Sequence, residues 1–221
     1  MAERRELIMK RFKITIGGIA VIILTLISQR GEVVFVCLLA ALIHELGHLT
    51  AARLQKIDVE RIELGLMGAR IVVDDRLCSY KSELILAASG PLANILAVII
   101  SIAVSLTCGV GAEELFESGA ELVGQGGGIV GAVGCFVLAS IAQAAVNLLP
   151  VRSLDGGRML SAAVSQWLGA DIGERAVTVF TAVAVFCLWT VALYLMLRVG
   201  SGVGVFTFAA CVFFCLLTRG E

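Results

Sequence analysis

Residues 33–52 read V-V-F-V-C-L-L-A-A-L-I-H-E-L-G-H-L-T-A-A, an apolar stretch that contains both histidines of the chain, His44 and His48. On a helix, residues i and i+4 lie on one face, so both imidazoles can point at a single metal ion. Glu45 then lies where it can take a proton from a metal-bound water. Because polar and metal-binding groups are costly within a membrane-spanning segment, this pattern indicates a functional site.

The composition is that of an integral membrane protein. The chain has 221 residues, of which 59% are hydrophobic and 16% are charged, and its mean hydropathy is +0.98. Soluble domains usually have about 25% charged residues. We therefore predict an all-α polytopic membrane protein, residues 1–221 forming a single membrane-embedded domain. About six segments are near the ~20 residues that span a bilayer: 14–29, 33–52, 83–106, 129–149, 176–197 and 199–218.

The distribution of positive charge predicts the orientation of these spans. If the chain crosses six times, all of the 17 Lys and Arg residues except Arg30 and Arg198 fall on one side. Positively charged connections stay in the cytoplasm, so both termini are predicted to be cytoplasmic and the protein to lie in the cell membrane. The connection 107–128 has four glutamates and no Lys or Arg, which places it outside. It is too short to be expected to hold a folded module.

The segment 57–82 differs from the apolar spans. Val59–Leu66 alternates apolar and charged residues, Met67-Gly68 offers a turn, and Ala69–Val73 continues as a short apolar run. This pattern predicts a small β-hairpin, which we expect at the cytoplasmic face. The hairpin is either a surface connector or an exposed strand edge to which an extended peptide can add.

Two histidines do not complete a catalytic zinc site, which usually has three protein ligands and one water. Since no third histidine exists, the third ligand must be a carboxylate or a thiolate, and two carboxylates compete, Glu83 and Asp155. Span geometry alone leaves both open. For Asp155 to reach the histidines, the chain after Asn147 must leave regular helix within the bundle, which Pro150 and the following Gly-Gly pair permit.

Three motifs resemble those of the site-2 proteases, which are intramembrane zinc metalloproteases. They are H-E-L-G-H at 44–48, S-G-P-L-A-N at 89–94 and N-L-L-P-V-R-S-L-D-G at 147–156. The last fits the family pattern N-x-x-P-x-x-x-L-D-G at every specified position. The resemblance covers about 33–157, which it implies is the catalytic core, with 14–29, 176–197 and 199–218 as accessory spans.

The resemblance also implies roles for individual residues. His44, His48 and Asp155 would hold Zn²⁺, Glu45 would be the general base, and Asn147 would position substrate or stabilise the oxyanion. The layout looks most like the six-span bacterial branch that includes the stage IV sporulation protease, which cleaves a pro-sigma factor on the cytoplasmic side. No PDZ insertion and no C-terminal CBS domain are expected.

The expected function is therefore that of a zinc metalloendopeptidase that cleaves a membrane-associated protein substrate near the cytoplasmic face, such as a transcription-factor precursor. Two alternatives stay open: a membrane-anchored zinc protease of another clan that uses Glu83 as third ligand, and a non-catalytic zinc-binding scaffold. Glu45 argues against the scaffold, which has no need of a base. The expected partners are the substrate and the lipid bilayer, a membrane inhibitor protein is a candidate, and nucleic acid is not expected.

Overall fold

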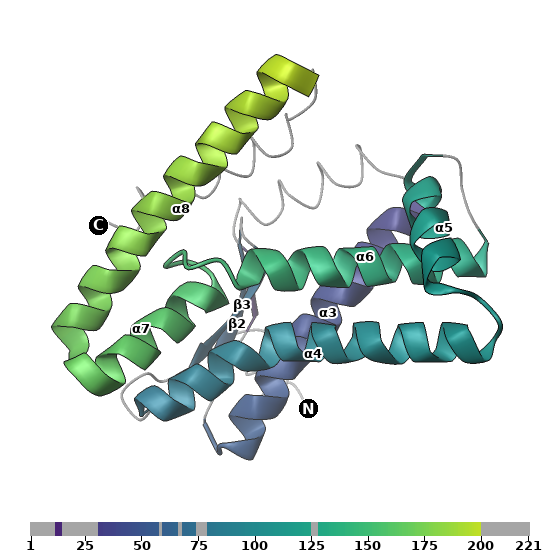
Figure 1. The fold of residues 1–221 in the computed structure, drawn as a ribbon. Coiled ribbons are helices and arrows are strands. Elements are labelled where there is room, and N and C mark those ends of the chain that lie inside the picture. The colour runs from purple at the N-terminus through teal and green to yellow at the C-terminus, as the bar shows by residue number, and fades with distance from the viewer. Residues whose placement is uncertain are drawn as a thin grey trace. The chain divides into compact units, whose positions relative to one another are not determined.

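The computed structural model describes residues 12–14, 31–57, 59–65, 68–73, 79–124 and 128–199 (Figure 1). In chain order the elements are β1 (Phe12–Ile14), α3 (Gly31–Leu54), β2 (Val59–Gly65), β3 (Gly68–Val73), α4 (Tyr80–Thr107), α5 (Ala112–Gly124), α6 (Ile129–Asn147), α7 (Asp155–Leu168) and α8 (Ala170–Val199). The chain divides into two compact units. The first comprises Met1–Leu77 and Ser89–Val146, and the second comprises Cys78–Ala88 and Asn147–Glu221.

Four of the described helices, α3, α4, α6 and α8, are long and apolar enough to cross a membrane. They contain the spans predicted at 33–52, 83–106 and 129–149 almost entirely, and α8 begins before the span predicted at 176. Except for their end residues, the predicted spans 14–29 and 199–218 lie outside the described residues. The structure therefore supports a multi-pass helical protein with four candidate spans, and the total of six stays a prediction.

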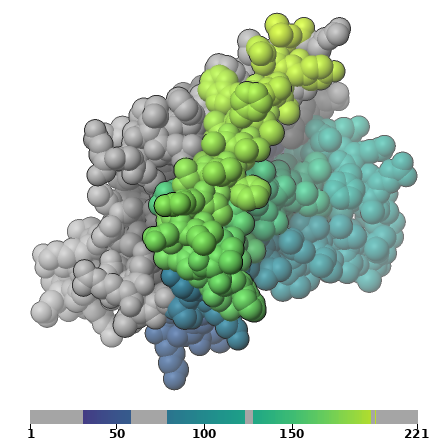
Figure 2. All heavy atoms as spheres, turned by 60° about the vertical axis from the view of Figure 1, so that its left-hand side comes forward, coloured from purple at the N-terminus to yellow at the C-terminus, as the bar shows by residue number. Residues whose placement is uncertain are grey.

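Helix α8 illustrates why these helices suit a bilayer. Figure 2 shows its side chains as yellow-green spheres. After the exposed charged residues of its first turns, Asp171, Glu174 and Arg175, its exposed side chains are mostly apolar, which is typical of a helix that meets lipid instead of water. The large exposed hydrophobic side chains of this helix are Ile172, Val179, Phe180, Val183, Phe186, Val191, Leu193, Tyr194 and Leu197.

In the first unit, α5 packs against α6 where two glycines face each other. A Cβ atom on Gly134 would lie 2.9 Å from the Cα atom of Gly119, so the two backbones approach more closely than side chains would allow. Leu115 and Leu122 of α5 are buried, and Leu122 joins a core cluster with residues of α3 and α6. The sequence predicted no helix in the connection 107–128, and α5 forms there because these apolar positions give it one face to bury.

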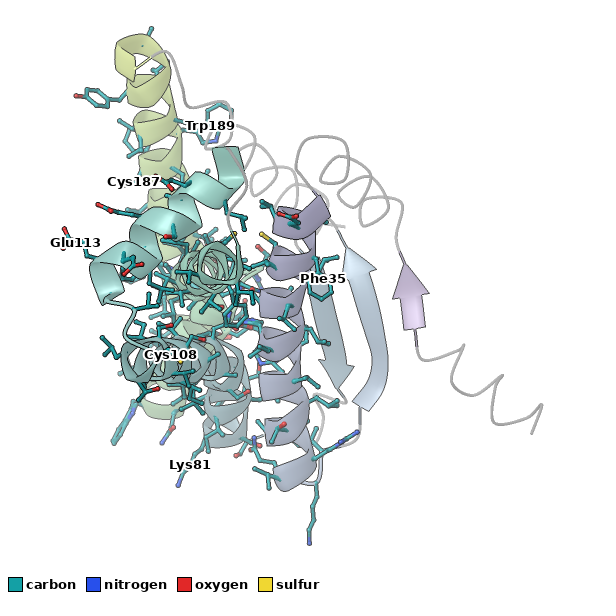
Figure 3. All side chains as sticks on the ribbon, turned by 90° about the vertical axis from the view of Figure 1, so that its right-hand side faces the viewer. Phe35, Lys81, Cys108, Glu113, Cys187 and Trp189 are labelled. Carbon is teal, nitrogen blue, oxygen red and sulfur yellow. The ribbon has the colours of Figure 1, made fainter. Side chains whose placement is uncertain are left out.

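A small sheet also belongs to the first unit. Its strand order is β1-β2-β3. Strand β2 pairs in parallel with β1, where Phe12 lies opposite Ile62, and antiparallel with β3, where Ile62 lies opposite Ile71. The β2–β3 pair occupies the segment where the sequence predicts a hairpin, whereas β1 was not expected. Figure 3 shows β3 between β2 and α3. The location of this sheet at the cytoplasmic face stays a prediction.

In the second unit, the amphipathic helix α7 packs against α8. The two helices meet at Gly169, whose φ of 92° lies in the left-handed region that glycine adopts without strain. Near this junction a Cβ atom on Gly173 would lie 3.1 Å from the Cβ of Ser165, a buried residue of α7. This close packing joins the start of α8 to the end of α7.

Candidate metal centre

Helix α3 brings the two histidines together as their spacing predicts. The Nε2 atoms of His44 and His48 lie 3.2 Å apart, and the two residues are only 3% and 6% exposed. Two nitrogen ligands about 2.0–2.1 Å from one tetrahedral zinc ion lie roughly 3.3 Å apart. The pair therefore fits a zinc ion with almost no rearrangement. Glu45 lies between them in sequence and is partly buried.

Helix α4 supplies a polar neighbour for the other nitrogen of each imidazole. The Nδ1 atom of His48 lies 3.3 Å from the hydroxyl oxygen of Ser89. The Nδ1 atom of His44 lies 3.4 Å from Nδ2 of Asn94. A histidine that ligates a metal almost always donates its second ring N–H to an acceptor, which fixes the tautomer and the ring orientation. Ser89 can accept such a bond directly.

Asn94 can meet the same need by rotation of its side-chain amide. The residue is fully buried, and its Oδ1 atom has no hydrogen-bond partner among the described residues. Half a turn of the amide would bring Oδ1 to His44, where it would accept from Nδ1–H. Both histidines would then present a bare Nε2 to the metal. The orphaned oxygen is thus consistent with a metal-binding tautomer of His44.

Gly90 lies directly against the Nε2 atoms of both histidines. A Cβ atom on Gly90 would be 2.7 Å from Nε2 of His44 and closer still to Nε2 of His48. A Cβ atom on Gly47 of α3 would be 2.5 Å from the carbonyl oxygen of Ser89 and 2.7 Å from Cβ of Ala93. The two helices therefore cross at glycines, and α4 presents the backbone of Gly90 to the Nε2 side of the histidine rings.

Ser89 and Gly90 were not assigned functional roles from the sequence, although the motif that contains them was recognised. The signal was available in part, because Gly90 and Asn94 are four residues apart and share a helix face. The sequence does not show what this face of α4 packs against. In the structure it packs against the histidine pair of α3.

Asp155, the predicted third ligand, is the first residue of α7 and is 8% exposed. One condition for Asp155 to reach the histidines, that the chain leave regular helix after Asn147, is met, because α6 ends there. The chain then folds back on itself. A Cβ atom on Gly157 would be 2.8 Å from Cα of Arg152, and one on Gly156 would collide with the backbone of Leu148 and Leu149. The Gly-Gly pair is thus required for the turn that precedes α7.

The carboxylate of Glu83, the rival ligand, is bound by an arginine. Nε and Nη2 of Arg158 both lie 2.8 Å from Oε1 of Glu83. Nη1 of the same guanidinium lies 3.8 Å from Oδ1 of Asp155. Arg158 thus separates the two carboxylates that compete for the role of third ligand.

A threonine of α8 holds the loop between α6 and α7. The backbone N–H of Arg152 donates to the hydroxyl oxygen of Thr181 at 2.9 Å. The same hydroxyl donates to the carbonyl oxygen of Pro150 at 3.3 Å. Thr181 is 4% exposed, so these bonds form away from water. A lone threonine in an apolar span gives no sequence signal for this role.

Asn147 is the last residue of α6 and is partly buried. Its side chain therefore lies at the start of the loop that leads to Asp155. The role in substrate positioning that the resemblance implies stays a prediction.

These features define a class of protein, a polytopic membrane protein with a buried histidine pair suited to a metal ion. Residues 32–191 match peptidase family M50, and the chain belongs to this family, whose members are metalloproteases.

Among solved structures, the site-2 protease from Methanocaldococcus jannaschii is similar with a TM-score of 0.59 and 21% sequence identity, over 92% of this chain and 87% of that chain. At this identity the likeness shows a shared fold. A search of curated proteins finds no match.

Proposed function

We propose that this chain is an intramembrane zinc metalloendopeptidase that cleaves a membrane-associated protein substrate near the cytoplasmic face. The observation that carries the proposal is the 3.2 Å separation of two buried Nε2 atoms, on an apolar helix of an M50 family member. The acidic residue within H-E-L-G-H supports an active enzyme over a scaffold, because binding alone needs no base.

Asp155 is the third ligand in this proposal. Its burial supports the role, since a buried carboxylate needs a cation or hydrogen bonds to offset its desolvation. The pairing of Glu83 with Arg158 disfavours the alternative, because Glu83 would first have to give up two charge-assisted contacts. The three residues offer two imidazoles and one carboxylate, a donor set typical of catalytic zinc.

A zinc ion held there would lower the pKa of its bound water to about 7 and polarise the scissile carbonyl. Glu45 accepts the proton of the attacking water and delivers it to the leaving amine. Ser89 and Asn94 hold the imidazoles in the orientation that exposes Nε2. The side-chain amide of Asn147 positions the substrate or donates to the oxyanion.

The substrate must be extended at the cleaved bond, because a helix hides its carbonyl groups in internal hydrogen bonds. Strand β3 is an edge of the described sheet and lies beside α3 (Figure 3). Its free backbone groups can pair with an unwound segment and replace the hydrogen bonds that the segment has lost. The sheet is therefore the proposed substrate cradle.

The finer assignment follows the resemblance to the sporulation branch. The substrate is a transcription-factor precursor such as a pro-sigma factor, and a membrane inhibitor protein is the candidate regulator. The charge distribution supports cytoplasmic termini, and hence a cytoplasmic position for the cleavage site. No nucleic-acid contact is proposed.

The test is co-expression of the chain with a panel of single-span and amphipathic membrane substrates, followed by detection of cleavage fragments. Glu45→Gln should abolish cleavage while zinc content is unchanged. Glu32→Gln, an exposed glutamate at the start of the same helix, is the matched control and should cleave normally. Cleavage by Glu45→Gln within a few-fold of wild type would remove Glu45 from the mechanism. Zinc binding without cleavage of any substrate would favour the scaffold.

A further inference from the structure

Arg158 contacts two carboxylates at once. Its Nε and Nη2 atoms lie 2.8 Å from Oε1 of Glu83 on α4. Its Nη1 atom lies 3.8 Å from Oδ1 of Asp155, which precedes it by three residues on α7. Residues three apart on a helix are neighbours on its surface. The guanidinium therefore has one edge committed to Glu83 and another directed at Asp155.

This arrangement differs from an ordinary surface ion pair. The side chains of Arg158 and Glu83 are 24% and 23% exposed, whereas those of Arg152 and Glu174, an ion pair a few residues away, are 51% and 53% exposed. Exposed pairs contribute little because water and salt screen them. A partly desolvated pair with two contacts holds its geometry better, because the planar guanidinium is a rigid fork.

We infer that Arg158 is a positioning residue for Asp155, and that Glu83 is the residue that fixes Arg158. The inference rests on the proposed role of Asp155 as a metal ligand. The guanidinium attracts Oδ1 of Asp155 and so favours one side-chain rotamer, which would leave Oδ2 for the metal ion. Groups that orient a ligand in this way commonly change metal affinity 10- to 100-fold when they are removed.

Electrostatics explain why Glu83 is needed as well. An unbalanced guanidinium beside a metal site repels the incoming cation. Glu83 neutralises that charge while it leaves the hydrogen-bonding edge of Arg158 in place. Substitution of Glu83 should therefore weaken metal binding in two ways: Arg158 loses its fixed orientation, and its positive charge is no longer balanced.

A purely structural clamp between the start of α4 and α7 predicts a different result. Such a clamp would change the thermal stability of the apo protein, but not its affinity for metal once folded. A positioning role predicts a change in metal affinity, and also in the visible absorption spectrum of the Co²⁺ form, which reports the geometry around the ion. The two roles are therefore separable without measuring cleavage.

The experiment uses the full chain, purified in detergent and stripped of metal. Zn²⁺ affinity is measured against a competing chelator, and the Co²⁺ spectrum and the apo melting temperature are recorded for each variant. Arg158→Gln and Glu83→Gln should each weaken Zn²⁺ binding about 10- to 100-fold. Arg158→Lys, which keeps the charge but not the fork, should recover part of the loss. Arg152→Gln is the matched control and should bind within about twofold of wild type.

The double variant decides whether Glu83 acts through Arg158. If it does, adding Glu83→Gln to Arg158→Gln should cause no further loss of affinity, because the two residues act as one unit. A further loss as large as that of Asp155→Ala would make Glu83 a ligand and overturn the inference. Unchanged affinity and an unchanged Co²⁺ spectrum in Arg158→Gln would overturn it too. Unchanged affinity in Asp155→Ala would instead refute the proposed ligand set, a failure that this variant alone reveals.

Discussion

Gly90 lies so close to His48 that a single methyl group on Gly90 would collide with Nε2 of the imidazole. Among the residues of α4 that lie against the histidine pair, the one nearest the Nε2 atoms thus has no side chain. Overpacking a buried contact of this kind typically costs about 1–3 kcal/mol, and here the atoms displaced would be the proposed metal ligands.

Gly90→Ala should therefore abolish or strongly reduce zinc binding and lower the melting temperature. A loss of stability would be informative, because Gly→Ala within a helix otherwise stabilises the protein by up to about 1 kcal/mol. Gly31→Ala is the control, since a Cβ atom there meets nothing within 4 Å. Zinc analysis and thermal unfolding of both variants check the prediction, and normal zinc content in Gly90→Ala would contradict it.

Asn94→Ala should lower zinc affinity about tenfold or more, because His44 would lose the group that can fix its tautomer. Ser140→Ala is the matched control: Ser140 is also fully buried, and its hydroxyl has no partner among the described residues. Its substitution should leave affinity unchanged. Chelator competition measures both, and equal effects of the two changes would show that Asn94 serves packing alone.

Thr181→Val should loosen the loop before Asp155. The change removes the hydroxyl that accepts from the N–H of Arg152 and donates to the carbonyl oxygen of Pro150. Each net hydrogen bond contributes about 0.5–1.5 kcal/mol, so we expect the free energy of unfolding to fall by about 1–3 kcal/mol and zinc binding to weaken. Thr178→Val is the control, since that exposed hydroxyl bonds only within its own helix, to the carbonyl of Glu174. Thermal unfolding and zinc titration measure both variants. Equal changes in melting temperature and zinc affinity for the two would contradict the prediction.

The substrate cradle can be tested by proline at a position of β3 whose backbone N–H points to the open edge of the sheet. Gly65 and Gly68 close the hairpin with two residues between them. The two residues that flank such a loop form a hydrogen-bonded pair. Along an antiparallel ladder, hydrogen-bonded and non-hydrogen-bonded pairs then alternate. The N–H of Arg70 should therefore point at β2, and that of Ile71 at the open edge.

Ile71→Pro should then cut cleavage strongly while zinc content and the sheet survive, because it removes only an edge donor. Arg70→Pro, the comparison, should break the hairpin itself. Ile62 is no clean test, since β2 is paired on both sides. Cleavage assays with zinc analysis decide the matter. Full turnover by Ile71→Pro, and by Ala69→Pro two residues earlier, would make the sheet a connector.

Periodicity and spacing predicted the parts of this protein that depend on local sequence. The i, i+4 pair placed His44 and His48 on one face, and the apolar run 129–149 gave α6 to within two residues of its end at Asn147. Helix α5 was missed because its apolar face is short. Ser89, Gly90, Thr181 and the Glu83–Arg158 pair were missed because each acts across a contact between distant segments, which no local pattern encodes.

Thr181 connects the proposed ligand loop to a helix that is long and apolar enough to cross a membrane. The charged residues Asp171, Glu174 and Arg175 lie in the first turns of α8, and residues 176–194 that follow hold no charge. This uncharged stretch corresponds to about 28 Å of helix, close to the roughly 30 Å hydrocarbon thickness of a bilayer. If α8 crosses the membrane, Thr181 lies about 8 Å inside the charged end of that stretch. The loop that Thr181 holds would then lie below the membrane surface, at a depth fixed by this one helix.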